Sequence, residues 1–323
     1  MRILVTGAYG FVGTWLRQEL AAAGHEPIAA PPREELDVTD GVATSTYLRL
    51  IGPDAVAHLA AISQPLQART NPDKALRVNV GGTIAVINAM LALPSPPALL
   101  VVGSSEVYGA RTPMTPTGFT ESGPIDPQGA YALSKIAQEA VSIEAAAQHG
   151  LRVVVTRSFN HTGPGQRPPF VAPSLALRAL GLRSGSGEIR VGNLDVRRDF
   201  LDVRDVVRAY RLLLEAAVRG ETPGTGLVVN VASGRSVPIG EIVRLLCDAA
   251  GVPMRTSADP VLIRPGELAE IRGDTSRLRA ITGWEPRIPL RATLADLVAE
   301  LDTAGATIDA AGAALGAPTA APQ

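Results

Sequence analysis

The sequence predicts an α/β fold in which a doubly wound parallel sheet is followed by a smaller C-terminal α/β lobe. Two observations predict it. Apolar stretches of strand length alternate with stretches whose apolar residues recur at helical spacing, as in parallel sheets covered by helices. A glycine-rich turn, residues 7–13, joins the first expected strand to the first expected helix. The chain has 323 residues, of which 46% are hydrophobic, and is long enough to bury such a core.

The expected elements follow in order along the chain. Residues 3–5 form the first strand, and Val12, Leu16 and Leu20 recur at helical spacing in a helix over 11–23 that Gly24 ends. Further strands are expected at 27–30, 55–59, 99–102 and 153–156, and further helices at 75–92, 130–149, 202–217 and 239–250.

The glycine turn has the spacing of a dinucleotide-binding loop, which makes the predicted sheet a Rossmann-type one. Gly7 permits the tight turn, Gly10 leaves room for a pyrophosphate, and Gly13 lets the helix pack closely on the strand. The helix N-terminus offers free N–H groups to phosphate charge. A plain strand-to-helix turn explains the glycines alone, but their place at the start of a βαβ pattern favours cofactor binding.

Composition changes near residue 160, where proline and glycine cluster in residues 163–169. We therefore expect an NAD(P)-binding domain over 1–160, to which residues 195–235 partly return, and a substrate-binding lobe over 161–302. Residues 303–323 are rich in alanine, glycine and threonine and are expected to form a flexible tail.

Composition also excludes several classes of protein. The net charge of −1 gives no reason to expect a nucleic-acid partner, and the single cysteine, Cys247, allows neither an internal disulfide nor a cysteine metal site. No His/Asp/Glu spacing resembles a metal site either. Because no basic leader precedes the first strand and no apolar run reaches about 18 residues, we expect a cytoplasmic protein without a membrane partner.

The loop after the second expected strand bears on cofactor choice. The acidic residue that binds the adenosine ribose of NAD is absent from residues 27–30. Arg33 is placed to meet a 2′-phosphate, which favours NADP(H) over NAD(H), although a solvated loop arginine explains it equally well. Asp37 and Val38 resemble an adenine-contacting pair.

Tyr131 and Lys135 lie four residues apart in an expected helix, so the phenol and the ammonium share one face. Ionising a phenol of pKa about 10 at neutral pH requires about 4 kcal/mol, which a cation about 4 Å away supplies in a partly screened site. In the reducing direction Tyr131 instead starts neutral and gives its proton to a substrate oxygen that Ser104 holds. Tyr-x-x-x-Lys alone is more often a helix-surface pattern, but together with the glycine turn and Ser104 it favours an enzyme.

These motifs resemble the extended short-chain dehydrogenase/reductase superfamily, and within it the NAD-dependent epimerase/dehydratase group that modifies nucleotide sugars. The likeness runs from residue 1 to about residue 300, and its more specific part is similar to the branch that acts on GDP-mannose and its derivatives. It rests on the glycine turn, on SSEVYG at 104–109, on Tyr131 with Lys135, on SFNHTGPGQ at 158–166, on VGNLDVRRDFLDVRD at 191–205, on RPGE at 264–267 and on TGWEP at 282–286.

The resemblance implies roles for individual residues. Ser104, Tyr131, Lys135 and Glu106 are the expected catalytic residues. Asn160 and Arg198 are expected to bind the sugar diphosphate, Arg264 with Glu267 to close over the nucleotide, and Ser105 with Glu106 to face the substrate; an ion pair with Asp199 or Asp202 is a structural alternative for Arg198. The expected cofactor-binding residues are Gly7, Tyr9, Gly10, Phe11, Val12, Gly13, Arg33, Asp37, Val38, Leu59, Ala60, Ala61, Tyr131 and Lys135.

Within that branch the resemblance leaves more than one activity open. A reductase would reduce the C4 ketone of GDP-4-dehydro-6-deoxy-D-mannose to GDP-D-rhamnose, or to the C4 epimer GDP-6-deoxy-D-talose. The alternatives are a nucleotide-sugar 4,6-dehydratase or 4-epimerase with tightly bound NAD(P), and a dinucleotide-sensing protein without activity. The short loop over 30–37 and the chain length favour the reductase, Glu106 does not discriminate, and intact Ser104, Tyr131 and Lys135 argue against a mere sensor.

Two long helices predict an assembly. The expected helices at 75–92 and 130–149 are rich in alanine, valine and isoleucine on more than one face, which is more than one sheet contact needs. We therefore expect a homodimer through these helices, with a GDP-sugar as the small-molecule substrate.

Overall fold

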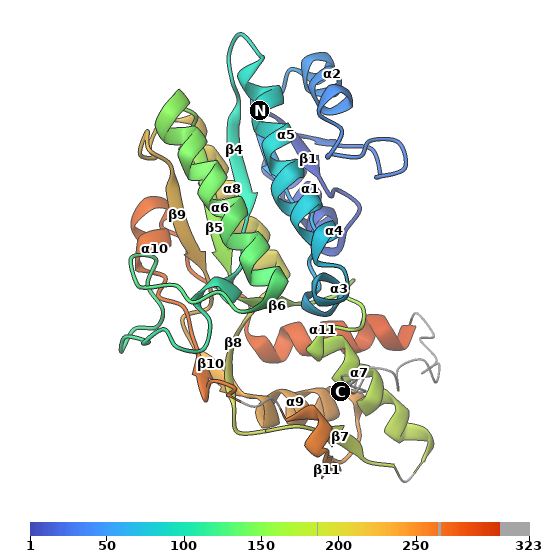
Figure 1. Ribbon diagram of the computed structural model, residues 1–323. Coiled ribbons are helices and arrows are strands. Elements are labelled where there is room, and N and C mark those ends of the chain that lie inside the picture. The colour runs from blue at the N-terminus through green and yellow to red at the C-terminus, as the bar shows by residue number, and fades with distance from the viewer. Residues whose placement is uncertain (186, 264–265, 304–323) are drawn as a thin grey trace. The chain divides into compact units, whose positions relative to one another are not determined.

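The computed structural model describes residues 1–185, 187–263 and 266–303, and they divide into two compact units (Figure 1). Unit 1 comprises Met1–Phe159, Val203–Gly234 and Gly273–Glu285. Unit 2 comprises Asn160–Asp202, Arg235–Arg272 and the described residues from Pro286 onward. Apart from Thr303, the predicted tail lies outside the described residues.

Unit 1 contains the predicted doubly wound sheet, which is confirmed. Six parallel strands lie in the order β2-β1-β3-β4-β5-β9. Chain order reverses between β1 and β3, and in open parallel sheets such a reversal creates a crevice at the carboxyl ends of the strands. The strands are β1 (Arg2–Thr6), β2 (Glu26–Ala29), β3 (Ala55–His58), β4 (Ala98–Val102), β5 (Val153–Ser158) and β9 (Leu227–Val231).

Helices cover both faces of this sheet (Figure 1). Helices α1 (Phe11–Ala22) and α8 (Val203–Val218) pack together on one face, and α2 (Gly41–Ile51), α5 (Gly82–Leu91) and α6 (Gly129–His149) lie on the other. Helices α3 (Pro65–Thr70) and α4 (Pro72–Leu76) pack beside α6, and α10 (Ser276–Thr282) packs on α8.

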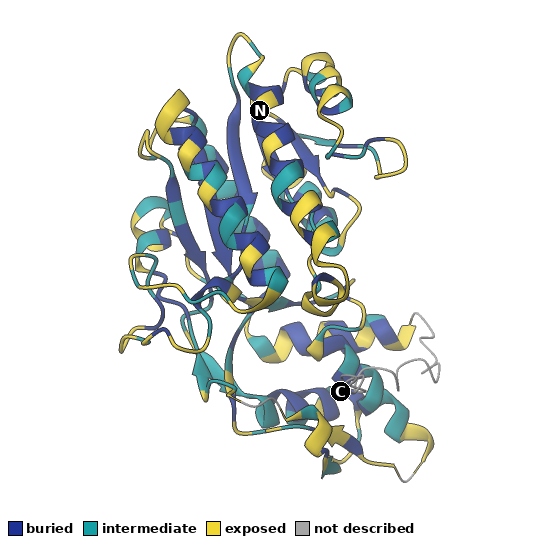
Figure 2. Ribbon diagram, viewed as in Figure 1, coloured by how far each residue is buried: buried dark blue, intermediate teal, exposed yellow. Residues whose placement is uncertain are grey.

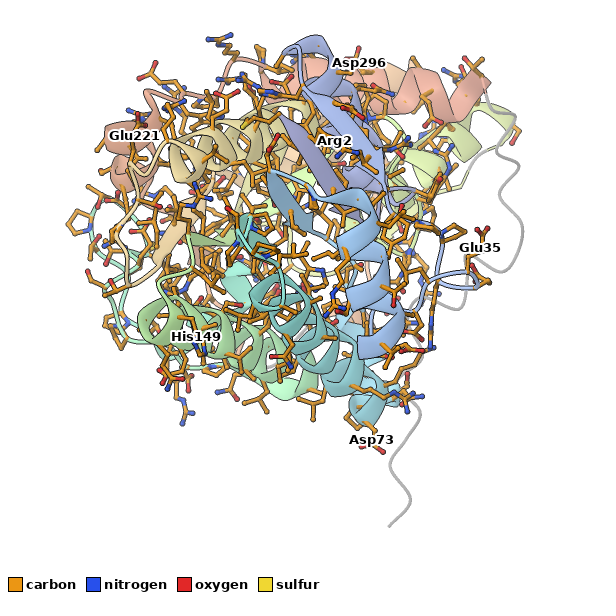
Figure 3. All side chains as sticks on the ribbon, turned by 90° about the horizontal axis from the view of Figure 1, so that it is seen from above. Arg2, Glu35, Asp73, His149, Glu221 and Asp296 are labelled. Atoms are coloured by element: carbon orange, nitrogen blue, oxygen red, sulfur yellow. The ribbon has the colours of Figure 1, made fainter. Side chains whose placement is uncertain are left out.

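The core lies between the sheet and these helices. Figure 2 shows the strands buried along their length and the helices buried only on the side facing the sheet. Leu4, Val56 and Leu99 on adjacent strands are fully buried and share a cluster with Val86 and Met90 of α5. The charged side chains of Glu35 and Asp73 lie on the outside (Figure 3).

The predicted helix over 75–92 is interrupted. Between α4 and α5 the backbone makes a π-helical turn, Arg77–Gly81, which adds one residue to a turn of helix. Asn79 lies in this turn and is fully buried; its side chain bonds both backbone groups of Ile62, accepting from the N–H at 2.7 Å and donating to the carbonyl at 3.2 Å. Helical periodicity does not report such a turn, because the hydrogen bonds that hold it come from a distant loop.

The segment 273–285, which the predicted boundaries leave in the smaller lobe, packs with unit 1. The indole N–H of Trp284 donates to the backbone carbonyl of Asp205 in α8 at 3.0 Å. The Asn230 amide in β9 donates to the Asp274 carbonyl at 3.2 Å. These buried polar contacts bring the chain back to the first unit after it has contributed strands to the second.

Unit 2 has its own small sheets and core. Strand β8 (Arg197–Asp202) pairs with β6 (Asn160–Thr162), β10 (Ser236–Pro238) and β12 (Glu270–Ile271), while β7 (Ile189–Val191) pairs with β11 (Thr256–Ala258). Helices α7 (Val171–Gly181), α9 (Ile239–Ala250) and α11 (Leu290–Thr303) pack around a cluster that includes Ala176, Leu246 and Leu297. Cys247 is buried in the same cluster.

Short 3₁₀ turns occur at 105–108 in unit 1 and at 182–184 and 260–262 in unit 2. None of the described helices combines the length and the apolarity that a membrane crossing requires.

Candidate functional site

The glycine turn after β1 is shaped by close backbone contacts. Gly7 has φ +65°, and a Cβ there would lie 2.8 Å from the Ala60 backbone nitrogen. A Cβ on Gly13 would lie 2.2 Å from the Gly7 carbonyl oxygen, so α1 packs against the turn only because residue 13 has no side chain. Gly10 caps α1 with an ordinary φ of −74° and no crowding below 3.3 Å.

This turn fits a dinucleotide phosphate. The first turn of α1, residues 11–14, carries no acidic residue, so its N–H groups and the helix dipole present positive potential. Phe11 and Val12 begin that helix, and Tyr9 lies before it with 62% of its surface exposed. The Arg17 guanidinium lies 5.2 Å from the centre of the Tyr9 ring.

The segment after β3 lies against the glycine turn. The Thr6 hydroxyl accepts from the backbone nitrogens of Leu59 at 3.1 Å and Ala60 at 3.2 Å. Its own hydrogen therefore goes to the Nδ1 atom of His58, 2.8 Å away. Ala61 follows, half-buried. The predicted cofactor residues 7–13 and 59–61 thus meet at the point where strand order reverses.

The loop after β2 holds Arg33 and Asp37 together. The Arg33 Nε atom donates to Asp37 at 3.1 Å, and Asp37 also accepts from the backbone and hydroxyl of Thr39 at 2.9 and 2.8 Å. These hydrogen bonds hold the pKa of Asp37 below its usual value, and the one from the Thr39 backbone has the largest effect. Val38 is buried beside them, against Gly82 of α5.

Ser104 and Tyr131 come together at the carboxyl end of β4. Gly103 lets the chain turn there, because a Cβ would lie 2.4 Å from the Thr156 carbonyl oxygen of β5. Ser104 then caps the 3₁₀ turn, accepting from the Glu106 nitrogen at 3.2 Å. Its side chain also hydrogen-bonds Tyr131 of α6. Ser105 is half-buried and Glu106 exposed in the same turn.

The electrostatics keep Tyr131 neutral. Burial raises the pKa of Tyr131 to about 12; the hydrogen bond from Ser104 opposes this shift, while Glu106 and Tyr210 add to it. Of the two protonation states that the sequence leaves open for Tyr131, burial favours the neutral phenol.

Lys135 is almost fully buried one turn after Tyr131. Its ammonium donates to the Val102 carbonyl at 2.8 Å and to the side-chain oxygen of Gln138 at 2.9 Å. Burial lowers the pKa of Lys135 to about 7. His58 is fully buried, and burial together with Lys135 lowers its pKa to about 3, so it is neutral at ordinary pH.

Three of the predicted substrate residues, Asn160, Arg198 and Glu267, lie in unit 2. Asn160 is exposed at the start of β6. Arg198 in β8 donates to Glu267 at 2.6 Å and to the Leu268 carbonyl at 2.9 Å, with its side chain 12% exposed. Glu267 therefore holds Arg198. Arg264 lies outside the described residues. Throughout the described ranges, no group of three His, Cys, Asp or Glu side chains is arranged to hold a metal.

Sequence reasoning missed three polar residues behind Lys135. Asn79 and Thr83 lie four residues apart in an otherwise apolar helical stretch, and Gln138 follows Lys135 at helical spacing. All three side chains are buried and hydrogen-bonded to one another or to their neighbours. A buried polar side chain on an apolar helix is costly unless paired, and that spacing was the available signal.

Known proteins resemble the chain over nearly its whole length. It is 36% identical over 307 residues to the GDP-6-deoxy-D-mannose reductase of Pseudomonas aeruginosa, covering 94% of this chain and 97% of the relative. It is 27% identical over 300 residues to the GDP-6-deoxy-D-talose 4-dehydrogenase of Aggregatibacter actinomycetemcomitans, covering 92% and 97%. The structure of RMD from Pseudomonas aeruginosa complexed with NADPH superposes with a TM-score of 0.83 at 33% identity, covering 94% of this chain and 99% of that one.

A family model covers most of unit 1. The model of the NAD dependent epimerase/dehydratase family matches residues 3–232, from β1 to the residue after β9. That span holds the glycine turn, Ser104, Tyr131 and Lys135. The chain belongs to the NAD dependent epimerase/dehydratase family.

Proposed function

We propose that this protein is an NAD(P)H-dependent nucleotide-sugar 4-reductase, which reduces the C4 ketone of GDP-4-dehydro-6-deoxy-D-mannose. The observation that carries the proposal is the 36% identity across 94% of the chain with a GDP-6-deoxy-D-mannose reductase. The hydrogen-bonded Ser104 and Tyr131 beside a buried Lys135 support it. The product is GDP-D-rhamnose, or GDP-6-deoxy-D-talose if the sugar presents its other face.

The proton chemistry follows from the local electrostatics. The bound cofactor supplies the hydride for C4. Tyr131, which is neutral, donates its phenolic proton to the C4 oxygen, and Ser104 donates a second hydrogen bond to that oxygen. The ketone thereby becomes an alcohol, and the phenolate that remains is stabilised by the Lys135 ammonium on the same helix face until solvent returns the proton. The raised pKa keeps the Tyr131 phenol protonated before the reaction, so the proton is present to be given.

The cofactor is NADPH in this proposal. The structure of RMD from Pseudomonas aeruginosa, which superposes on this chain, contains NADPH. In this chain the loop after β2 presents Arg33, half-exposed and braced by Asp37, where a 2′-phosphate needs a cation. The crowded glycines 7 and 13 and the acid-free start of α1 would hold the pyrophosphate.

Unit 2 supplies substrate binding in this proposal. Arg198 would offer its planar guanidinium to the diphosphate of the GDP-sugar, and Glu267 fixes its orientation. Asn160 and Arg264 are assigned to the same substrate by family resemblance. Nucleotide sugars and reduced nicotinamide are intracellular metabolites, so we place the enzyme in the cytoplasm.

We also propose a homodimer through the helices beside the lysine. Three large apolar side chains are exposed on neighbouring helices: Leu76 at 45% on α4, Ile84 at 40% on α5 and Leu133 at 50% on α6. Exposed apolar side chains on adjacent helices are typical of a face that a second copy covers.

A product assay tests the function. The purified protein is given GDP-4-dehydro-6-deoxy-D-mannose with NADPH or NADH, loss of reduced cofactor is followed, and the sugar is identified by NMR. Consumption with a GDP-rhamnose or GDP-6-deoxytalose product is expected and reveals the face of attack. A 4-keto sugar formed from GDP-mannose without added cofactor would instead establish a dehydratase.

A further inference from the structure

A column of buried polar side chains lies behind Lys135, where α6 packs against α5 and the π-helical turn. Asn79 and Thr83 come from one side, and Ser134 and Gln138 come from α6; each is at most 1% exposed. Two apolar helices pack without polar groups, and each buried amide or hydroxyl costs free energy unless it is paired. Packing of the two helices therefore does not explain why these four polar side chains are buried there.

Hydrogen counting fixes the direction of the Gln138 amide. The Thr83 hydroxyl donates its one hydrogen to the Asn79 carbonyl at 2.7 Å, so its oxygen faces Gln138 as an acceptor. The Gln138 nitrogen donates to that oxygen at 2.8 Å. The amide oxygen is left pointing at the Lys135 ammonium, 2.9 Å away. The reversed amide would place two donors against each other.

The column is anchored at its other end. The Asn79 amide donates to the Ser134 hydroxyl at 2.9 Å, and that hydroxyl donates to the Tyr131 carbonyl at 2.7 Å. Asn79 also holds the Ile62 backbone, just after Ala61. The chain of bonds therefore joins the loop after β3 to both the Tyr131 and the Lys135 turns of α6.

Lys135 depends on neutral oxygens. None of the ion pairs among the described residues includes Lys135, whose ammonium contacts the Val102 carbonyl and the Gln138 amide. Of the titratable groups around it, His58 on β3 is neutral, and Glu139 on the next turn of α6 is paired with Arg157 of β5 at 2.6 Å. Tyr131 on α6 is neutral as well, and Glu106, in the turn after β4, raises the pKa of Tyr131.

We propose that Gln138 is a positioning residue for the catalytic lysine: its amide oxygen, oriented by Thr83, holds the Lys135 ammonium in direction and keeps it protonated. This inference rests on the proposed function, because it assigns Gln138 to the lysine of that reaction. A protonated, fixed ammonium is what the phenolate of Tyr131 needs after it has given up its proton. Gln138 itself does not touch the reacting atoms.

The sequence allows a direct test, because the chain has only two lysines, Lys74 and Lys135. Protein grown with ¹³C-labelled lysine gives two side-chain signals, and the one that Lys135→Met removes belongs to Lys135. Its pKa is then measured by NMR titration in two variants of similar size. Gln138→Met removes the acceptor and should lower the Lys135 pKa by about one unit, whereas Gln138→Glu adds a carboxylate and should raise it by about one unit.

Controls separate this role from packing. Gln148→Met and Gln148→Glu make the same changes at an exposed position of α6 and should leave the Lys135 titration unchanged. Thr83→Val keeps the shape of the Thr83 side chain but frees the Gln138 amide to turn. It should lower the Lys135 pKa as Gln138→Met does. It replaces Gln138→Met in the test if Gln138→Met does not fold. Equal titrations in Gln138→Met, Gln138→Glu and the parent protein, or shifts of the same sign, would overturn the proposal.

The reaction gives a second readout. The alkaline limb of kcat/KM should move to lower pH in Gln138→Met and to higher pH in Gln138→Glu, because the protonated lysine is the active form. If the NMR shifts occur but the parent protein does not reduce the sugar, the proposed function fails while the contact between Gln138 and Lys135 stands. If the sugar is reduced but the NMR shifts are missing, only the role of Gln138 fails.

Discussion

Tyr131 carries its phenolic proton at neutral pH because burial keeps the phenol neutral. Burial raises its pKa to about 12, and Glu106 adds to the shift. The positions of Tyr131 and Lys135 on one helix face follow from their spacing of four, which the sequence shows. Their protonation states do not, because desolvation depends on residues from β3, β4 and α8 that only the fold brings together.

Tyr131→Phe should lower kcat by at least about 100-fold while NADPH binding changes less than about threefold, because only the proton donor is lost. Stopped-flow reduction and fluorescence titration of NADPH measure the two quantities. Tyr108→Phe is the matched control: its hydroxyl donates to Asn230 at 2.6 Å in the interior, so the substitution should cost about 1 kcal/mol of stability and leave kcat nearly intact. Unchanged turnover in Tyr131→Phe would remove this residue from proton transfer.

Arg33→Ala should weaken NADPH binding about tenfold or more and leave NADH binding almost unchanged, because only NADPH has the 2′-phosphate that the guanidinium would meet. The Kd of each cofactor measures this. Arg69→Ala, on the exposed end of α3, removes a cation away from that loop and serves as the control. Equal losses for both cofactors would show that Arg33 does not read the phosphate.

Lys135→Met should stabilise the protein most at low pH. Burial lowers the folded-state pKa of Lys135 from 10.5 to about 7, so between these values the unfolded chain binds more protons and stability rises with pH. Below pH 7 the penalty is fully present, and removing the charge should raise the free energy of unfolding by up to about 5 kcal/mol, which is the difference between the two pKa values converted at about 1.36 kcal/mol per unit. The gain should shrink as pH approaches 10. Urea unfolding at pH 6, 8 and 10 without added cofactor measures it, and a gain independent of pH would contradict the burial argument.

At the level of the element, the glycine turn and the π-helical turn differ in how far the sequence predicts them. Gly7 and Gly13 are visible as a spacing, and their contacts with Ala60 and Gly7 explain why nothing larger fits. The π-helical turn at 77–81 falls inside an unbroken helical pattern. It exists because Asn79 bonds the Ile62 backbone and Ser134, which are 17 and 55 residues away.

Gly13→Ala should cost roughly 2–4 kcal/mol of stability and weaken NADPH binding at least about tenfold, because its Cβ would force the first turn of α1 away from Gly7. Gly41→Ala is the matched control, since position 41 begins α2 with open space around it. Denaturant unfolding and cofactor titration give both numbers. If both variants behave alike, close packing of α1 on the turn is not what residue 13 provides.

At the level of the whole molecule, the chain passes between the two units more than once. Periodicity predicts the six-stranded sheet, because each parallel strand is a compact apolar run. Periodicity predicts the unit boundaries less well. Helix α10 joins unit 1 by packing on α8, and Trp284 joins it by a hydrogen bond to Asp205; neither contact leaves a pattern in the nearby sequence. Likewise one partner of Arg198, Glu267, is 69 residues away along the chain, whereas the sequence suggested only the neighbouring acids Asp199 and Asp202 for an ion pair.

Ile84→Glu should convert the proposed dimer to monomer, because it places a charge in the apolar face formed with Leu76 and Leu133. Light scattering after size-exclusion chromatography measures the mass. Val42→Glu, on α2 with 79% of Val42 exposed, is the matched control and should leave the assembly unchanged. A parent protein that is already monomeric at micromolar concentration would contradict the dimer.

We expect hydride to pass from added NADPH to C4 of a GDP-sugar. The most direct measurement supplies NADPH deuterated on C4 of the nicotinamide, with one preparation for each face, together with GDP-4-dehydro-6-deoxy-D-mannose. One of the two preparations should place one deuterium at C4 of the sugar for each cofactor consumed. Conversion of a GDP-sugar with no net cofactor consumption and no deuterium at C4 would contradict the claim and identify a recycling dehydratase or epimerase.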